Sequence, residues 1–453
     1  MNILIITSYF PPDTTIAAVR PYMFAKHLLQ FGHQVTVLRS GILDKKPDHS
    51  YPPPEGLRVI SCLGDDSPAE VFERGGEAPY SFMPRESRAT FLSPAIRSAI
   101  DKVYIVRGVC MKPVNFLGWM RHSKAQFALQ KKALDKLRGE RFDIVFATYG
   151  ELENVWAGPY AAEIFNCKWI LDLRDPIPAP HVYRGPMLST LARIQDRALS
   201  QADACTIVAD GIRISSHGLQ SSDKVHTIYN GYEPILGEFK AAEPLPGVFS
   251  ICYTGQIYPN LQTAVPLFRA LRQLGEQGRI QLDRVRLEYA GPDFGTLQAE
   301  AEALHMEQCL NDHGYLSREE AARLQSQSDI FLVLSWNKKG QIGVLTGKFH
   351  EGIRAGKPIL SIVAGEVPNS ELDQVNQRFH YGFCYEESRD AELFPQLCDF
   401  LLQAYTQKME RGAVDYAPSE ELSTHFRYDT LTRKLEALCV ELVNGKTSES
   451  DPI

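Results

Sequence analysis

The alternation of short apolar runs with helix-length segments is the feature that most constrains the fold of this 453-residue chain. In the first half, the strand-like runs lie at 3–7, 35–38, 57–62, 143–147, 168–173 and 204–208. The pattern restarts in the second half, with runs at 249–254, 285–290, 329–334 and 358–363. Such alternation is typical of βαβ units, which build parallel sheets covered by helices. Because one hydrophobic core rarely serves more than about 250–300 residues, we expect an α/β protein with two doubly wound, Rossmann-like domains.

A stretch rich in proline and glycine, from 232 to 246, separates the two alternating patterns and is the expected linker. We therefore expect an N-terminal domain at 1–235 and a C-terminal domain at 236–425. The residues that follow predict a C-terminal helix at 426–445, returning to the N-terminal domain, and a flexible polar tail at 446–453. In the second domain, helices are expected to begin near Leu261, Gly295, Ser317 and Thr346.

The composition argues against several classes of protein. The nine cysteines are scattered singly with no Cys-x-x-Cys pair, which favours reduced thiols and a cytoplasmic location over disulfides or zinc. No secretory leader and no apolar run of the ~18 residues that a spanning helix needs are visible. The net charge of −7 argues against a nucleic-acid partner. Neither a His-x-x-x-His nor an Asp-x-Asp motif is present, so we predict no metal.

One segment departs from this acidic balance. Residues 95–141 carry eleven Lys and Arg side chains against three acidic ones. Aromatic and apolar residues, among them Phe116, Trp119 and Phe127, are interleaved with these cations. This combination suits contact with an anionic membrane surface, and a solvated helix face is the alternative.

The segment from 343 to 358 has the chemistry to bind a nucleoside diphosphate. Thr346 and Gly347 place a hydroxyl and unhindered N–H groups at a helix start, and Lys348 adds a cation for the diphosphate. Glu351 lies one turn after Gly347, where its carboxylate can accept hydrogen bonds from vicinal ribose hydroxyls. An ordinary surface helix with a Thr346 N-cap and a Gly356 C-cap would show the same local pattern.

A second group of candidates ends the strand at 168–173. Arg174 and Asp175 either orient an acceptor hydroxyl or form an internal ion pair that fixes the loop. Arg20, on the first turn of the first helix, could contact phosphate or an acceptor's negative charge, but a solvated helix residue is the commoner case, and we do not count it as catalytic.

Several motifs in order resemble glycosyltransferase family 4, whose members have the GT-B fold. They are the Gly-His-Gln-Val-Thr-Val run at 32–37, Asp-Leu-Arg-Asp at 172–175, Asn-Gly-Tyr at 230–232, Tyr-Thr-Gly at 253–255 and the segment around Glu351. The resemblance implies two Rossmann-like domains facing a central cleft, with a nucleotide-diphosphate-sugar donor in the second and a glycan or lipid-linked acceptor in the first. It further implies hexosyl transfer with retention, in surface polysaccharide biosynthesis, by a cytoplasmic enzyme peripheral to the inner face of the membrane. The nucleotide sugar is then a substrate, and no cofactor is expected.

The resemblance also assigns site residues. On the donor side they are Gly255, Gln256, Gly343, Thr346, Gly347, Lys348 and Glu351. The loop on the acceptor side contributes Asp13, Thr14 and Ala17. Catalysis is assigned to Lys348, Arg174 and Asp175.

Two positions depart from the family pattern. Gly343 stands where many members carry an acidic residue, eight positions before Glu351, and Gln256 stands where many carry an arginine beside the diphosphate. Leaving-group stabilisation in such reactions is electrostatic, so Lys348, or an arginine from elsewhere in the chain, would have to supply the missing cation. Two other functions stay open: a catalytically degenerate GT-B partner protein and a sugar-nucleotide epimerase of the same architecture.

Overall fold

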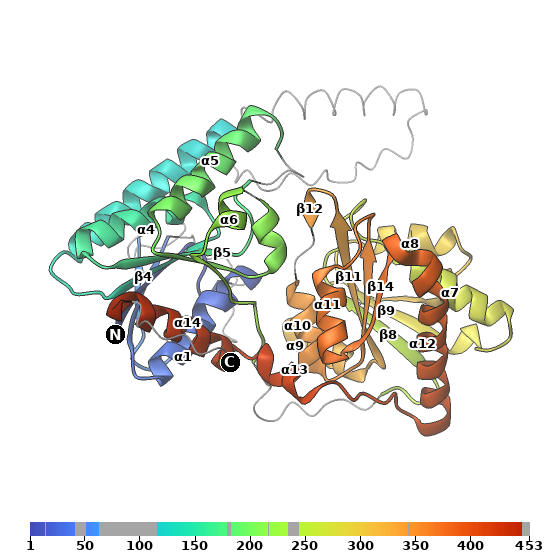
Figure 1. Ribbon diagram of the computed structural model, residues 1–453. Helices are drawn as coiled ribbons and strands as arrows, with labels where there is room; N and C mark the ends of the chain where they lie inside the picture. The colour runs from blue at the N-terminus through green and yellow to red at the C-terminus, as the bar shows by residue number, and fades with distance from the viewer. Residues whose placement is uncertain are drawn as a thin grey trace, which may run out of the picture. The chain divides into compact units, whose positions relative to one another are not determined.

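The computed structural model describes residues 1–13, 15–40, 51–62, 116–178, 183–215, 217–233, 244–342 and 345–445. Two predicted site residues, Thr14 and Gly343, lie outside this described part, as do the basic segment before 116 and the tail after 445. The chain divides into two compact units, each built on its own sheet (Figure 1). The first unit comprises Met1–Ile207, Ser216–His226 and the chain from Glu436 onward, and the second comprises Val208–Ser215 and Thr227–Leu435.

The first unit contains a seven-stranded sheet in the order β3-β2-β1-β4-β5-β6-β7. Its strands are β1 (Asn2–Thr7), β2 (Gln34–Arg39), β3 (Arg58–Ser61), β4 (Ile144–Tyr149), β5 (Lys168–Leu173), β6 (Ala204–Ile207) and β7 (Val225–Thr227). Every pairing from β3 to β6 is parallel. The predicted parallel α/β sheet of the first half is therefore confirmed.

Helices lie on both faces of this sheet (Figure 1). They are α1 (Val19–Gln30), a helix at 116–136, α4 (Leu152–Phe165), α5 (Pro186–Gln201) and the short α6 (His217–Ser221), with the 3-10 turn η1 (Ile16–Ala18). The 3-10 turn η2 (Asp210–Ser215) belongs to the second unit. Strands covered on both faces must be apolar along their length, which is why β1, β4 and β5 read as continuous apolar runs.

The second unit repeats this architecture in the order β10-β9-β8-β11-β13-β14, with β12 paired antiparallel to β11. Its strands are β8 (Phe249–Thr254), β9 (Val285–Ala290), β10 (Leu310–Asp312), β11 (Ile330–Lys338), β12 (Gln341–Ile342), β13 (Ile359–Ala364) and β14 (Gly382–Glu386). Its helices are α7 (Val265–Glu276), α8 (Phe294–Glu302), α9 (Arg318–Gln327), α10 (Gly347–Ala355), α11 (Glu371–Phe379), α12 (Asp390–Arg411) and α13 (Glu420–His425), with 3-10 turns at Leu282–Arg284, Glu307–Cys309 and Glu387–Arg389.

The alternation of side chains along β11 divides the core of the second unit into two layers. Ile330, Leu332 and Leu334 face one layer, which packs against α7, α8 and α12. Phe331 and Val333 face the opposite layer, which packs against α10 and α11. Both faces of the sheet are therefore buried, and the polar ends of the strands are left as the place for chemistry.

Several predicted boundaries moved. The first helix of the second unit begins at Val265 instead of near Leu261, because Leu261 and Gln262 form a turn on the Tyr258 carbonyl. Strand β11 runs on to Lys338 because β12 pairs with its end. The last helix, α14 (Tyr428–Asn444), contributes to both units: its residues from Glu436 on belong to the first, where the Glu436 carboxylate contacts His33 at 2.8 Å.

The eight cysteines of the described residues are free thiols, and six of them are buried. No helix in the described ranges is long and apolar enough to cross a membrane.

Candidate functional site

The strongest candidate site lies at the edge of the second sheet where its parallel strands end. There the loops after β8 and β9 cross closely: Gly255 donates its N–H to the Ala290 carbonyl at 2.7 Å, with a φ of +115°. A Cβ on Gly291 would lie only 2.4 Å from the Gly255 carbonyl oxygen. Both positions therefore require glycine, one for its backbone conformation and the other for space.

The N-terminus of α10 lies at the same edge, because α10 connects β11 to β13. Leu345 and Phe349 are buried in the core and anchor its first turn. Thr346 is the N-cap, but its side chain makes no capping hydrogen bond, and its buried hydroxyl has no hydrogen-bond partner among the described residues. The Phe349 N–H donates to the Thr346 carbonyl at 3.0 Å. The N–H groups of Gly347 and Lys348 precede any intrahelical acceptor, so this helix start is suited to an anion.

Lys348 supplies a cation beside these groups. Its Nζ lies 5.4 Å from the centre of the Tyr253 ring, and its Cε would be 2.8 Å from a Cβ on Gly255. In the described part of the chain, no carboxylate forms an ion pair with it. Burial lowers the pKa of Lys348, and the charges of Glu351 and Asp293 oppose that shift. A partly desolvated ammonium without an ion-pair partner is available to a bound anion.

Glu351 follows one turn later and is held from one side. Its Oε2 accepts a hydrogen bond from Gln325 Nε2 at 2.9 Å, and the Thr254 hydroxyl lies 3.5 Å away. Its Oε1 has no hydrogen-bond partner among the described residues. The carboxylate thus retains a free oxygen that can accept hydrogen bonds from a ligand.

Gln256, in the loop after Gly255, adds no cation to the site. Its backbone carbonyl accepts a hydrogen bond from the Tyr253 hydroxyl at 2.7 Å. The same loop is fixed by Asp293, which accepts the Ile257 N–H at 3.0 Å, and by Lys338, whose Nζ donates to the Asn260 carbonyl at 2.6 Å. Asp293 and Lys338 escaped the sequence analysis because they lie far from this loop along the chain.

The corresponding edge of the first sheet is braced internally. Arg20 is 2% exposed and forms a two-pronged contact with Asp172, at 2.8 and 3.1 Å. The expectation that Arg20 is a solvated helix residue is therefore wrong; its partner lies two strands away in the sheet order. Burial disfavours the ionised form of Asp172, but Arg20 and the Thr206 hydroxyl outweigh it, so the pKa of Asp172 lies below its ordinary value.

Arg174 and Asp175 do not form an ion pair with each other; the ion pair at this edge joins Arg20 and Asp172. The Arg174 guanidinium donates to the Ala17 carbonyl at 2.6 Å and to the Tyr149 carbonyl at 3.1 Å, so it ties the loop after β1 to the end of β4. Asp175 is exposed. Asp13 is buried and accepts the Thr15 N–H at 2.9 Å. An acceptor role for these residues stays a prediction.

Two further carboxylates, missed by the sequence analysis, lie at the first sheet's edge. Glu151 accepts hydrogen bonds from Tyr9 and from the Trp119 indole, both at 3.0 Å. Glu153 is 3% exposed and accepts from the Ser8 hydroxyl at 3.1 Å. Burial, with the Glu151 charge added to it, raises the pKa of Glu153 to about 7. The only signal for these groups was a Glu-x-Glu after a predicted strand.

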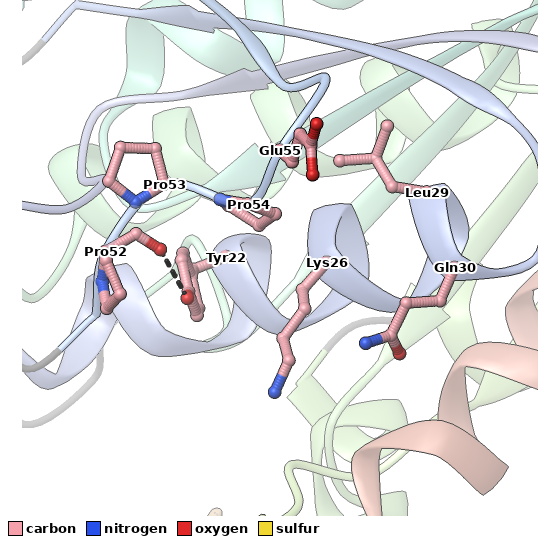
Figure 2. A pocket seen from close by; sticks show the side chains of 8 residues that line it. All are labelled: Tyr22, Lys26, Leu29, Gln30, Pro52, Pro53, Pro54 and Glu55. Carbon is pink, nitrogen blue, oxygen red and sulfur yellow. Dashed lines mark hydrogen bonds between the residues drawn. The ribbon is translucent and has the colours of Figure 1, made fainter.

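A cavity of about 500 Å³ lies elsewhere in the first unit, along the flank of α1 (Figure 2). Three consecutive prolines from Pro52 wall one side, and the Tyr22 hydroxyl donates to the Pro52 carbonyl. No predicted site residue lines it. Among the described residues, no cluster of three or more His, Cys, Asp or Glu side chains could hold a metal ion.

No protein-family model matches the chain, and no curated protein matches its sequence. Solved structures share its fold along nearly its whole length. Sucrose-phosphate synthase from Thermosynechococcus elongatus is similar with a TM-score of 0.59 at 12% identity, covering 98% of this chain and 100% of that one. HepE from Anabaena, in complex with UDP and glucose, has a TM-score of 0.54 at 12% identity, with 98% and 100% coverage.

A putative UDP-N-acetylglucosamine 2-epimerase from Listeria monocytogenes has a TM-score of 0.51 at 12% identity, covering 100% of this chain and 99% of that one. At these identities, similarity establishes the fold and not the activity. The chain has the two-domain α/β fold of the GT-B glycosyltransferases.

Proposed function

We propose that this protein is a glycosyltransferase that binds a nucleotide-diphosphate sugar in its second unit and transfers the sugar to a glycan or lipid-linked acceptor. The observation that carries the proposal is Lys348, a partly desolvated cation without an ion-pair partner among the described residues, beside the start of α10. Such a cation fits a diphosphate, and Glu351 one turn on fits the ribose. The UDP bound by the structurally similar HepE supports this kind of ligand.

In the proposed reaction, the bond between the sugar C1 and the diphosphate oxygen breaks, and a bond from C1 to an acceptor oxygen forms. Negative charge grows on the departing diphosphate. Lys348 and the first N–H groups of α10 stabilise that charge with dipoles and a cation already in place. Because Gln256 adds no charge, Lys348 takes the part that an arginine plays in many family 4 enzymes. Hexosyl transfer, retention, acceptor-side roles for Arg174 and Asp175, a cytoplasmic location and a place in surface polysaccharide biosynthesis belong to the same proposal.

A thermal-shift screen of the purified chain against UDP-, GDP-, ADP- and CMP-sugars tests the donor site. A ligand at 100 times its Kd stabilises the folded state by about 2.7 kcal/mol, which a melting curve resolves. We expect one nucleotide to raise Tm, and Glu351→Ala to abolish the shift. Glu319→Ala, which removes an exposed carboxylate from α9, is the matched control and should keep it. Absence of any shift in the wild-type protein would contradict the donor site.

The epimerase alternative is favoured by one observation, the similarity to the Listeria protein. An epimerase converts its sugar nucleotide without an acceptor, whereas a transferase releases the nucleoside diphosphate only when an acceptor is present. Product analysis after incubation with UDP-N-acetylglucosamine, first alone and then with a glycan acceptor, distinguishes them. Nucleotide binding with neither reaction would instead support the degenerate partner protein.

We also propose that the helix at 116–136 contacts an anionic membrane surface. Its buried side includes Trp119, Gln130 and Leu134. Its exposed side carries five basic residues: Arg121, Lys124, Lys131, Lys132 and Lys136. The one acidic residue of the described helix, Asp135, is partly exposed and forms an ion pair with Arg138. Each such cation near an anionic leaflet contributes about 1 kcal/mol of attraction, so the face as a whole can hold a protein at a membrane.

Co-sedimentation with vesicles tests this contact. We expect binding to vesicles containing phosphatidylglycerol and none to pure phosphatidylcholine, with loss of binding in the triple variant Arg121→Glu, Lys124→Glu, Lys132→Glu. The control changes the same net charge on exposed arginines of the second unit: Arg279→Glu, Arg284→Glu and Arg411→Glu. Equal loss in both variants would show that only net charge matters and would contradict a dedicated face.

A further inference from the structure

Gln325 is a buried polar residue next to the candidate donor site, and it has no part in the proposed transfer step. It lies on α9 and is 2% exposed. Its Nε2 donates to Glu351 Oε2 at 2.9 Å and to the Thr254 hydroxyl at 2.8 Å. Its Oε1 accepts from Arg354 Nη2 at 3.1 Å. All of these partners come from other elements, so this one amide links α9, β8 and α10.

The orientation of this amide is determined by chemistry. Arg354 has only N–H donors, so the group that faces it must be the amide oxygen. The NH₂ group must then face Glu351 and Thr254, where it finds a carboxylate and a hydroxyl oxygen. A buried amide with its partners satisfied on both ends has no other low-energy rotamer, because a flip would bring two donors together at Arg354 and two acceptors together at Glu351.

This arrangement fixes the orientation of the Glu351 carboxylate. Gln325 occupies Oε2, which holds the carboxylate in one rotamer and leaves Oε1 without a partner among the described residues. Without Gln325, the side chain of Glu351 would be free to rotate toward solvent or toward Lys348. Holding a recognition group in its binding geometry before the ligand arrives removes the entropic cost of ordering it later.

We infer that Gln325 is a positioning residue that orients Glu351 to recognise the ribose hydroxyls of the donor nucleotide, with Arg354 fixing the amide. The inference rests on the proposed donor site. Its consequence is specific: the preference of the protein for a ribonucleotide over the matching deoxynucleotide depends on Gln325, whereas the affinity for the diphosphate does not.

Calorimetric titration measures this preference. The probes are UDP, GDP and ADP, and then the 2′-deoxy and 3′-deoxy forms of whichever binds the wild-type protein most tightly. We expect Gln325→Leu to weaken binding of the ribonucleotide about tenfold, as for a lost hydrogen bond to a charged group, and to change binding of the deoxy form that already lacks the contact less than about twofold. Gln325→Glu, which keeps an acceptor for Arg354 but removes the donor to Glu351, should weaken the ribonucleotide at least as much.

A milder variant guards against misfolding of the first. Arg354 is only partly buried, and Arg354→Met leaves Gln325 in place but frees its amide to flip. We expect an intermediate loss of the ribonucleotide preference, about threefold, because the donor faces Glu351 only part of the time. Gln298→Leu, which removes an exposed glutamine from α8, is the control and should leave both affinities unchanged.

The outcomes separate the two proposals. If the wild-type protein binds none of the three diphosphates, the proposed donor site fails, and this inference fails with it. If it binds one, but Gln325→Leu weakens the ribonucleotide and both deoxynucleotides equally, then Gln325 only supports the fold and the inference alone is overturned. A selective loss for the ribonucleotide supports it.

Discussion

In each of the two sheets, charged side chains lie at the edge where the parallel strands end. The two edges differ in whether these charges have partners within the protein. At the first edge, Arg20 is paired with Asp172, and Arg174 is bound to two backbone carbonyls. At the second edge, Lys348 lacks an ion-pair partner and the Thr346 hydroxyl lacks a hydrogen-bond partner among the described residues. Both edges have the same position in a doubly wound sheet. The difference is that the cations of the first edge have partners within the protein, whereas Lys348 has no ion-pair partner among the described residues.

The role of such an edge depends on whether its charges already have partners within the protein. A buried charge that is paired inside the protein is costly to leave without its partner, whereas a partly desolvated charge without an ion-pair partner is available to a ligand. The first edge is therefore a brace, and the second is the proposed binding site. Substitutions at the two edges should have opposite signatures, one in stability and the other in affinity.

Breaking the brace should have the largest effect. Arg20→Met leaves Asp172 buried without its cation, and removal of one partner of a buried pair typically costs about 3–5 kcal/mol. We expect the free energy of unfolding in urea to fall by that amount. Arg284→Met, at an exposed arginine of the second unit, should change it little. A loss below about 1 kcal/mol for Arg20→Met would mean that Asp172 is accommodated without it, and the description of this edge as a brace would be wrong.

Glu153 is the exception at the first edge, because it is buried and no cation of the described residues forms an ion pair with it. Its pKa of about 7 exceeds the ordinary value near 4.5, so the folded state holds the proton more tightly than the unfolded chain. Its cost to stability is therefore absent below about pH 4.5, grows as the pH rises, and is complete above about pH 7. A shift of this size corresponds to about 3 kcal/mol.

We expect Glu153→Gln to be more stable than the wild-type protein at pH 8 by up to about 3 kcal/mol, and to differ little at pH 4.5. Urea unfolding at several pH values measures the difference between the two proteins. This difference isolates Glu153 from Glu371 of the second unit, whose pKa burial also raises to about 7. Parallel stability curves for the two proteins would show that Glu153 is ionised in the folded state at no cost.

Much of this comparison was invisible in the sequence. The strand at 168–173 was predicted to the residue, because an apolar run buried on both faces is a local signal. Strands β10 and β14, the two outermost strands of the second sheet, were missed, because a short outermost strand needs no continuous apolar run. Thr346, Lys348 and Glu351 were named together because Lys348 and Glu351 lie on one helix and Thr346 is its N-cap. The roles of Arg20 and Gln325 were not predicted, because their partners Asp172 and Glu351 lie 152 and 26 residues away along the chain.

Lys348→Met tests the second edge with the opposite signature. Removing a partly desolvated ammonium without an ion-pair partner should leave the melting temperature unchanged or slightly higher, because burial already disfavours that charge. Affinity for the nucleoside diphosphate should fall about tenfold or more, as expected for a lost charge-assisted contact to phosphate. A variant that loses stability but keeps its affinity would invert the comparison and remove Lys348 from the donor site.

The smallest effect on stability is expected at Asp175, the exposed carboxylate of the first edge. Asp175→Asn removes a charge that the fold does not use, so the free energy of unfolding should change by less than about 0.5 kcal/mol. If Asp175 orients the acceptor hydroxyl, KM for the acceptor rises about tenfold while the affinity for the nucleoside diphosphate stays the same, because the amide is a weaker acceptor than the carboxylate. An unchanged KM would remove Asp175 from the acceptor site, and Arg20, Asp172 and Arg174 already have partners within the protein. The contrast between a bracing edge and a binding edge would then extend to the acceptor, which would have to be recognised by other groups, such as Glu151 and its partners Tyr9 and Trp119.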